Sequence, residues 1–168
     1  MRLNVHRLIA PVALVISIAL GNCAALMDTD RPHTYLDLKI NLGSASTKAV
    51  EQRTFWVLQR YGFILVKQEL SPTRIYFETA WQIREAFMDE AQAGAVSAET
   101  RLFLRAGPLR GAASTKQTNR SVWLVAENRV HTGQGEIGIP PAHSDEFKAY
   151  IQAIAAALKS EYLRDSIF

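Results

Sequence analysis

Cysteine is almost absent from the chain, since Cys23 is the single cysteine among 168 residues. A chain with one cysteine cannot form an internal disulfide, so its fold must depend on a hydrophobic core. With 48% hydrophobic and 21% charged residues, the composition is that of one globular domain. A product of about 150 residues buries roughly 70% of its unfolded surface, so no disulfide is required for stability.

An excess of positive charge is also missing. The formal charge of the whole chain is +3, and Arg2 and Arg7 contribute two of these charges. Residues from Cys23 onward therefore have a net charge of +1. There is no dense stripe of Lys and Arg that could neutralise several phosphates, so we do not expect nucleic-acid binding. Internal repeats and coiled-coil heptads are absent as well.

Catalytic motifs are scarce. No serine lies in G-x-S-x-G, and Cys23 is too close to the N-terminal signal to act as a nucleophile. Residues 133–138 satisfy G-x-G-x-x-G, but a dinucleotide site needs a helix that opens at the glycines. Pro140 and Pro141 prevent such a helix, so we expect a flexible loop here.

Histidine could supply a metal site only if distant segments met. His33, His131 and His143 all fall in predicted loops, where Glu136 or Asp145 could add an oxygen ligand. Because their spacing matches no metal-binding pattern, we expect solvated side chains, no metal and no cofactor.

The N-terminus has the features of a secretory signal. Arg2, His6 and Arg7 form a positive region, and an apolar run extends from Leu8 to Leu20. A transmembrane helix needs about 20 apolar residues, and a proline within this run disfavours one further. We therefore expect residues 1–22 to be cleaved.

The apolar run ends in Leu20-Gly21-Asn22-Cys23-Ala24. This segment resembles a bacterial lipobox, in which signal peptidase II cuts before a cysteine that receives lipid. Asn22 departs from the pattern, because a small residue is usual there. Lipidation would also consume a thiol that is otherwise exposed in an oxidising compartment. The alternative is an ordinary signal cut after Gly21 or Ala25, with Cys23 incidental.

Lipid on Cys23 would anchor the protein to a membrane effectively permanently, since each buried methylene contributes about 0.8 kcal/mol. Ala24 lacks the aspartate that retains enteric lipoproteins at the inner membrane, so by that resemblance we expect the outer membrane, facing the periplasm. Residues 23–33 are expected to form a tether, 34–163 a single domain and 164–168 a C-terminal tail.

Hydrophobic periodicity predicts five strands and two helices. Alternation predicts strands at 35–40, 63–70, 74–84, 100–106 and 121–130. Helical spacing predicts a helix over 46–61, with Ser44 or Ser46 as N-cap and Gly62 at its C-terminal end. A second helix begins near Ser144, with Asp145 and Glu146 in its first turn.

The order β-α-β-β-β-β-α predicts an α+β fold, in which two amphipathic helices pack on one face of a mainly antiparallel sheet. The connections at 85–99 and 107–120 are expected to be long loops of undecided role.

The opposite sheet face would carry Glu78 and Glu127, two carboxylates that could divide acid and base roles if buried. By strand parity this face also carries Arg84, Arg101, Arg105 and Arg129. We therefore expect cross-strand ion pairs on a solvated surface and no catalytic residue.

Aromatic residues share this face with the arginines, a mixture that is enriched at the cores of interfaces. The possible interaction surface consists of Tyr35, Tyr76, Arg101, Phe103, Arg105 and Trp123.

Three short features resemble bacterial helix-grip lipoproteins: a signal ending at a cysteine, Tyr61-Gly62-Phe63 after a helix, and Thr79-Ala80-Trp81 on a long strand. The nearest relatives would be BamC, from outer-membrane β-barrel assembly, and more loosely LptE, from lipopolysaccharide export. The resemblance covers most of residues 34–163 and implies a non-enzymatic binding or assembly role, with an envelope complex as partner.

Two alternatives stay open. A soluble periplasmic module could bind an apolar ligand in a cavity between helices and sheet. A small hydrolase would need converging titratable groups, which the predicted inner face lacks.

Overall fold

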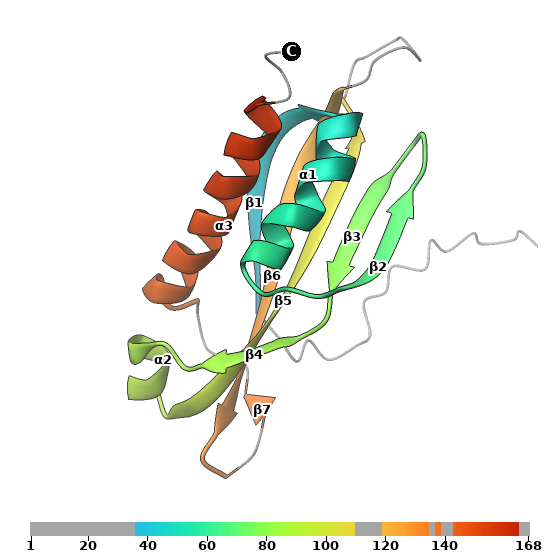
Figure 1. The fold of residues 1–168 in the computed structure, drawn as a ribbon. Coiled ribbons are helices and arrows are strands. Elements are labelled where there is room, and N and C mark those ends of the chain that lie inside the picture. The colour runs from blue at the N-terminus through green and yellow to red at the C-terminus, as the bar shows by residue number, and fades with distance from the viewer. Residues whose placement is uncertain (1–35, 110–118, 135–136, 139–142, 165–168) are drawn as a thin grey trace, which may run out of the picture. The chain divides into compact units, whose positions relative to one another are not determined.

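A computed structural model describes residues 36–109, 119–134, 137–138 and 143–164 (Figure 1). The predicted signal peptide and tether, including Cys23, and residues 165–168 of the tail lie outside the described residues. The elements are β1 (Leu36–Ser46), α1 (Thr47–Arg60), β2 (Leu65–Leu70), β3 (Ile75–Thr79), β4 (Gln82–Glu85), α2 (Met88–Gln92), β5 (Ala95–Pro108), β6 (Asn119–Thr132), β7 (Ile137–Gly138) and α3 (Asp145–Arg164).

The strands form one sheet in the order β1-β6-β5-β3-β2, in which β4 also pairs with β5 and β7 with β6. Every one of these pairings is antiparallel. The α+β class and the mainly antiparallel sheet are therefore confirmed. The predicted element count was wrong in detail, because the described residues form seven strands and three helices.

The strand predicted over 74–84 is two strands, β3 and β4, which pair with different parts of β5. At the end of β3 the Thr79 hydroxyl accepts the Leu102 N–H at 2.9 Å, and just after it the Ala80 N–H donates to the Ile64 carbonyl at 2.8 Å. These bonds replace continuous strand pairing and change the side-chain parity. Ile83, which an unbroken strand over 74–84 would place on the same face as the buried Ile75 and Phe77, is consequently 74% exposed.

The segment predicted as a loop over 85–99 contains the end of β4, the short helix α2 and the start of β5. Likewise, β7 occupies part of the predicted flexible loop at 133–138 and pairs with Val130 and His131. Both connections are shorter than their sequences indicate, because short regular elements lie within them.

The helix ends follow the predicted capping. The Ala49 N–H donates to the Ser46 Oγ at 3.1 Å, so Ser46 caps α1, whereas Ser44 lies within β1. Gly62 follows the end of α1 with a φ of +81°, the left-handed conformation that glycine adopts readily. The Phe147 N–H donates to the Ser144 Oγ at 3.1 Å at the start of α3.

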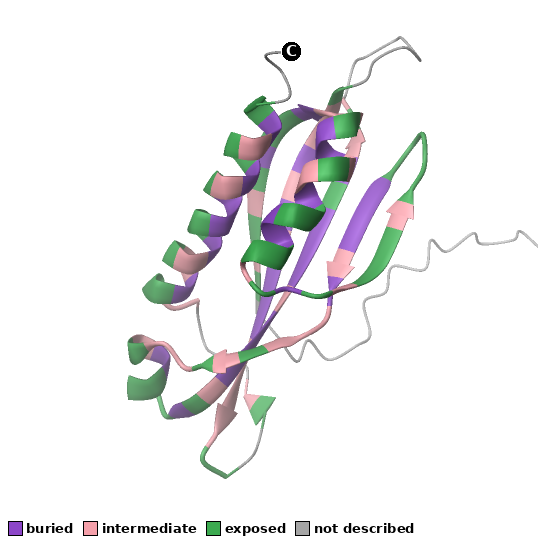
Figure 2. Cartoon of the chain, in the orientation of Figure 1, coloured by how far each residue is buried: buried purple, intermediate pink, exposed green. Residues whose placement is uncertain are grey.

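The hydrophobic core lies between the sheet and the two long helices (Figure 2). Its largest fully buried side chains are Phe77, Phe147, Leu58, Ile75, Leu102, Leu104, Leu124, Ile151, Ile154, Leu158, Val50 and Val57. Inside this layer the Thr54 hydroxyl and the Tyr162 hydroxyl are 2.8 Å apart, which links α1 to α3. No helix in the described part of the chain has the length and hydropathy needed to cross a membrane.

Candidate functional site

The sheet presents two different faces. Leu102, Leu104 and Leu124 pack beneath α1 and α3, both of which lie on the same side of the sheet in Figure 1. Side chains alternate along a strand, so Phe103 and Trp123 point to the opposite side. We call this opposite side the outer face.

Cross-strand register arranges the outer face in rows. Trp123 pairs with Arg105, and Arg105 pairs with Tyr76. The next row joins Val125, Phe103 and Glu78, and the row below joins Asp37, Glu127 and Arg101. The structure therefore brings together five of the six residues of the predicted interaction surface, while Tyr35 lies outside the described residues.

Arg101 occupies the centre of the outer face. Its Nε and Nη2 donate to the Glu127 Oε2 at 2.9 and 2.6 Å, and its Nη1 reaches the Glu78 Oε1 at 3.4 Å. The guanidinium also lies 4.7 Å from the ring centroids of both Trp81 and Phe103. Charge pairing and cation–π contacts thus hold this arginine in place.

These cross-strand ion pairs were expected on a solvated surface, but the outer face is partly buried. Tyr76, Phe103 and Glu127 are each only 6% exposed. The guanidinium of Arg101 lies over the Phe103 ring and that of Arg105 over the Tyr76 ring, which contributes to this burial. The outer face is therefore an ordered layer of paired charges and rings.

A second set of ion pairs lies further along β5 and β6. Arg129 donates through its Nε to Glu99, and its guanidinium lies 4.2 Å from the Trp81 ring centroid. The Nε2 of His131 is 3.4 Å from the Glu99 Oε1. His131 lies within strand β6, so its assignment to a loop was wrong.

Tyr76 contributes a hydroxyl group to the outer face. Its hydroxyl donates to the Glu78 Oε2 at 2.8 Å. Burial, with help from that acceptor, raises the pKa of Tyr76 to about 12. The phenol consequently stays protonated at neutral pH and serves as a structural donor.

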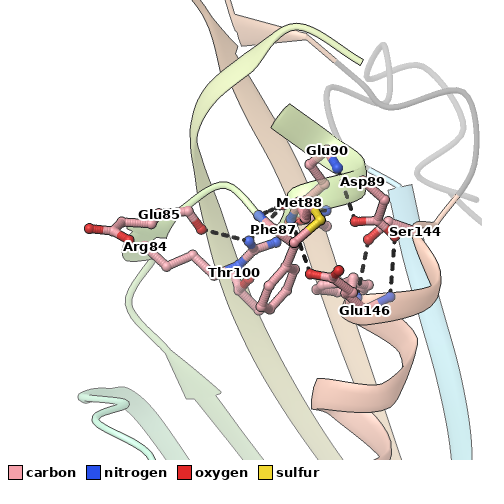
Figure 3. A network of polar contacts seen from close by, with 11 residues as sticks. Arg84, Glu85, Phe87, Met88, Asp89, Glu90, Thr100, Ser144 and Glu146 are labelled. Atoms are coloured by element: carbon pink, nitrogen blue, oxygen red, sulfur yellow. Dashed lines mark hydrogen bonds and ion pairs between the residues drawn. The ribbon is translucent and has the colours of Figure 1, made fainter. Parts of the chain in front are cut away.

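Arg84 does not lie on the outer face, which corrects the parity prediction. The break between β3 and β4 turns it to the helix side, where it bonds to Glu90 through both terminal nitrogens (Figure 3). Its Nε donates to the Thr100 Oγ1 at 3.1 Å, and its Nη2 donates to the Asn128 Oδ1 at 3.0 Å.

The Glu90 carboxylate is satisfied from three sides. Besides Arg84, it accepts the Asn128 side-chain N–H at 2.8 Å and the Phe87 backbone N–H at 2.9 Å. Burial favours a higher pKa, but these donors outweigh it and hold the pKa of Glu90 below its ordinary value. A carboxylate with all its partners fixed is suited to holding α2 against the sheet rather than to proton transfer.

Helices α2 and α3 exchange caps at their N-termini, as Figure 3 shows. The Met88 N–H donates to the Glu146 Oε2 at 3.0 Å, and the Glu146 N–H donates to the Asp89 Oδ2 at 3.3 Å. Each carboxylate thus lies at the positive end of the other helix. Neither this exchange nor the Arg84 cluster could be read from sequence, because no pattern predicted α2.

The two described histidines of the metal hypothesis, His131 and His143, lie in different surroundings. His131 contacts Glu99 on the outer face, whereas the ring of His143 stacks on Phe147 with centroids 5.2 Å apart. His33 and Glu136 lie outside the described residues. Within the described ranges, no group of three His, Cys, Asp or Glu side chains is placed to hold a metal ion.

In comparisons with known proteins, no family model matches the chain, and no curated protein is significantly similar to it.

Proposed function

We propose that this chain is a lipid-anchored protein of the bacterial envelope that binds a partner protein through its outer face and catalyses no reaction. The location rests on the N-terminal positive region, the apolar run and the lipobox-like sequence that ends at Cys23. The role in binding rests on the composition and order of the outer face.

One observation carries the binding role: a sheet face without either long helix bears aromatic rings and arginines held in fixed positions. Arg101 is fixed by Glu127 and by the Trp81 and Phe103 rings. A partner that packs on such a face meets side chains that have already lost their conformational freedom, so less entropy is lost on binding. Aromatic residues and arginine are also the residues that contribute most to interface energies.

The alternative function, binding of an apolar ligand in a cavity between helices and sheet, has less support than binding of a partner protein. Phe77, Phe147 and Leu158 are among the fully buried side chains that fill the layer between helices and sheet. Two open hollows lined by described residues, of about 750 and about 580 Å³, lie at the outer face and beside α2.

Site-specific photocrosslinking in intact membranes tests the binding role. Asp37 is exposed on the outer face and lies opposite Glu127 in the register of β1 and β6, so a photoreactive residue in its place would be exposed there too. The matched control replaces Gln152, which is exposed on α3.

We expect the Asp37 position to give a discrete crosslinked species with one envelope protein and the Gln152 position to give none. Equal crosslinking from both positions, or none from the outer face, would overturn the assignment of this face.

A further inference from the structure

We propose that one end of the outer face binds an acidic, extended segment of the partner protein, in a hollow lined by Lys39, Arg74, Arg105 and Trp123. This inference rests on the proposed binding role and specifies the chemistry of the partner. It follows from an uneven distribution of charge across the outer face.

At the centre of the outer face, and toward its end at Glu99, the arginines have acidic partners. Arg101 pairs with Glu127 and Glu78, and Arg129 pairs with Glu99. The positive charge of this region is therefore already neutralised within the protein, and it offers little electrostatic attraction to an anionic partner.

Three basic residues at the other end differ. Among the described residues, no carboxylate forms an ion pair with Lys39, Arg74 or Arg105. They contact aromatic rings instead: the Lys39 Nζ lies 4.7 Å from the Trp123 centroid, and the Arg74 guanidinium lies 5.0 Å from that of Tyr76. Cation–π contacts hold Lys39 and Arg74 beside these rings, and Arg74 also interacts electrostatically with Glu69 of β2 without forming an ion pair with it.

The same residues line a hollow. Lys39, Arg74, Arg105 and Trp123 line an open hollow of about 750 Å³ together with Ala106, Gly107, Pro108 and Ser121. None of the described residues that line this hollow is acidic, whereas three are positively charged and one is aromatic. Carboxylates can pair with such charges while the stem of an acidic side chain packs on the Trp123 ring.

The size of the hollow fits a short stretch of extended chain. Its lining spans β1, β6, β5 and the residue before β3, which are neighbours in the sheet. Three interstrand spacings of about 4.8 Å give about 14 Å, the length of roughly four extended residues.

A membrane surface fits the charge pattern less well than a peptide does. An adjoining hollow of about 300 Å³ is lined by Asp37 and Glu127 as well as by Lys39 and Arg105. A flat anionic surface would bring its charges against Asp37 and Glu127, whereas a peptide can place acidic residues over the basic end alone. Trp123 lines the hollow, and its side chain is only partly exposed.

The test uses the full-length chain in neutral detergent and a fluorescent peptide of six glutamates, with a peptide of six glutamines as reference. The double variant Lys39→Gln/Arg105→Gln removes two charges from the hollow. The matched control, Lys48→Gln/Lys159→Gln, removes two exposed charges from α1 and α3. Fluorescence anisotropy gives the affinities, and circular dichroism checks that both variants are folded.

We expect the glutamate peptide to bind and the glutamine peptide not to bind. The outer-face variant should bind about tenfold more weakly, and the helix variant should match the parent chain. Equal weakening in both variants would show attraction to overall charge only and would overturn the proposal. Absence of glutamate-peptide binding would overturn it too.

Vesicles of phosphatidylglycerol, compared with vesicles of phosphatidylcholine, separate a lipid from a peptide. If the parent chain binds the anionic vesicles, the Lys39→Gln/Arg105→Gln variant does not, and the peptide is not bound, then the hollow binds a lipid headgroup and not an acidic segment. If outer-face crosslinking succeeds and the peptide does not bind, the binding role stands and only the acidic chemistry of the partner is wrong.

Discussion

The guanidinium of Arg84 and the carboxylate of Glu90 form two parallel hydrogen bonds, with Nη1–Oε2 at 2.7 Å and Nη2–Oε1 at 2.8 Å. Their side chains are only 13% and 2% exposed, so both charges have lost most of their water. Arg84 also donates to the Thr100 hydroxyl, and the Asn128 side chain donates to Glu90, which completes the cluster. Such a pair is costly to form, and removal of one partner is costlier still, because it leaves a buried charge alone.

Glu90→Gln should therefore destabilise the fold by about 3 kcal/mol, since Arg84 would keep its charge without a counterion. Urea denaturation followed by circular dichroism measures this change. Asp145→Asn is the control, because Asp145 pairs with Lys148 while its own side chain is 95% exposed. The control should change the free energy of unfolding by about 0.5 kcal/mol or less. Similar values for both variants would contradict a structural role for the cluster.

The same carboxylate should make stability depend on acid pH. The pKa of Glu90 is lowered in the folded chain from an ordinary value of 4.5, so its ionised form stabilises the fold at higher pH. This contribution is complete above the unfolded pKa and is lost as the pH falls through the folded pKa. Urea midpoints between pH 6 and pH 3 should fall less steeply for Glu90→Gln than for the parent chain. Parallel profiles would show that Glu90 does not contribute to the acid dependence.

The hydroxyls of Thr54 and Tyr162 couple the two long helices. Burial raises the pKa of Tyr162 well above its ordinary value, so the phenol stays protonated and forms a hydrogen bond with the Thr54 hydroxyl. Tyr162→Phe should cost about 1 kcal/mol of stability. In a double-mutant cycle with Thr54→Val, the two losses should sum to more than the loss in the double variant. Strict additivity in urea denaturation would argue against the bond.

Gly62 should resist substitution for reasons of backbone geometry. Its φ is +81°, and a Cβ there would lie 2.7 Å from the Gln82 Nε2, which donates to the Tyr61 carbonyl at 3.1 Å. Gly62→Ala should therefore lower the free energy of unfolding by about 1–2 kcal/mol. Gly107→Ala is the matched control, since no atom lies within 4 Å of its Cβ position. Thermal denaturation should show a lowered midpoint for the first variant only.

The sequence patterns predicted the elements that follow one period over a long stretch. Both long helices were found with their caps, because amphipathic spacing and the hydroxyls of Ser46 and Ser144 are local signals. The outer-face rows of β5 and β6 also followed from alternation. These successes share one cause, since each depends on residues near one another in the chain.

The errors depend on contacts between distant segments. The break after Thr79 uses the Leu102 N–H, and this break decides that Arg84 faces the helices while Trp81 contacts Arg101. Helix α2 is only five residues long, too short for an amphipathic repeat, and Glu146 of α3 caps it. No local pattern encodes such tertiary bonds, so the Arg84–Glu90 cluster could not be predicted.

Labelling with radioactive palmitate tests most directly whether the protein is a lipid-anchored envelope protein. Cells that produce the full-length chain should incorporate label into it, and the labelled protein should sediment with membranes. Cys23→Ala should abolish the label and release the chain into the soluble fraction. Label that persists in this variant, or an unlabelled parent chain that keeps Met1 in the cytosol, would contradict the account.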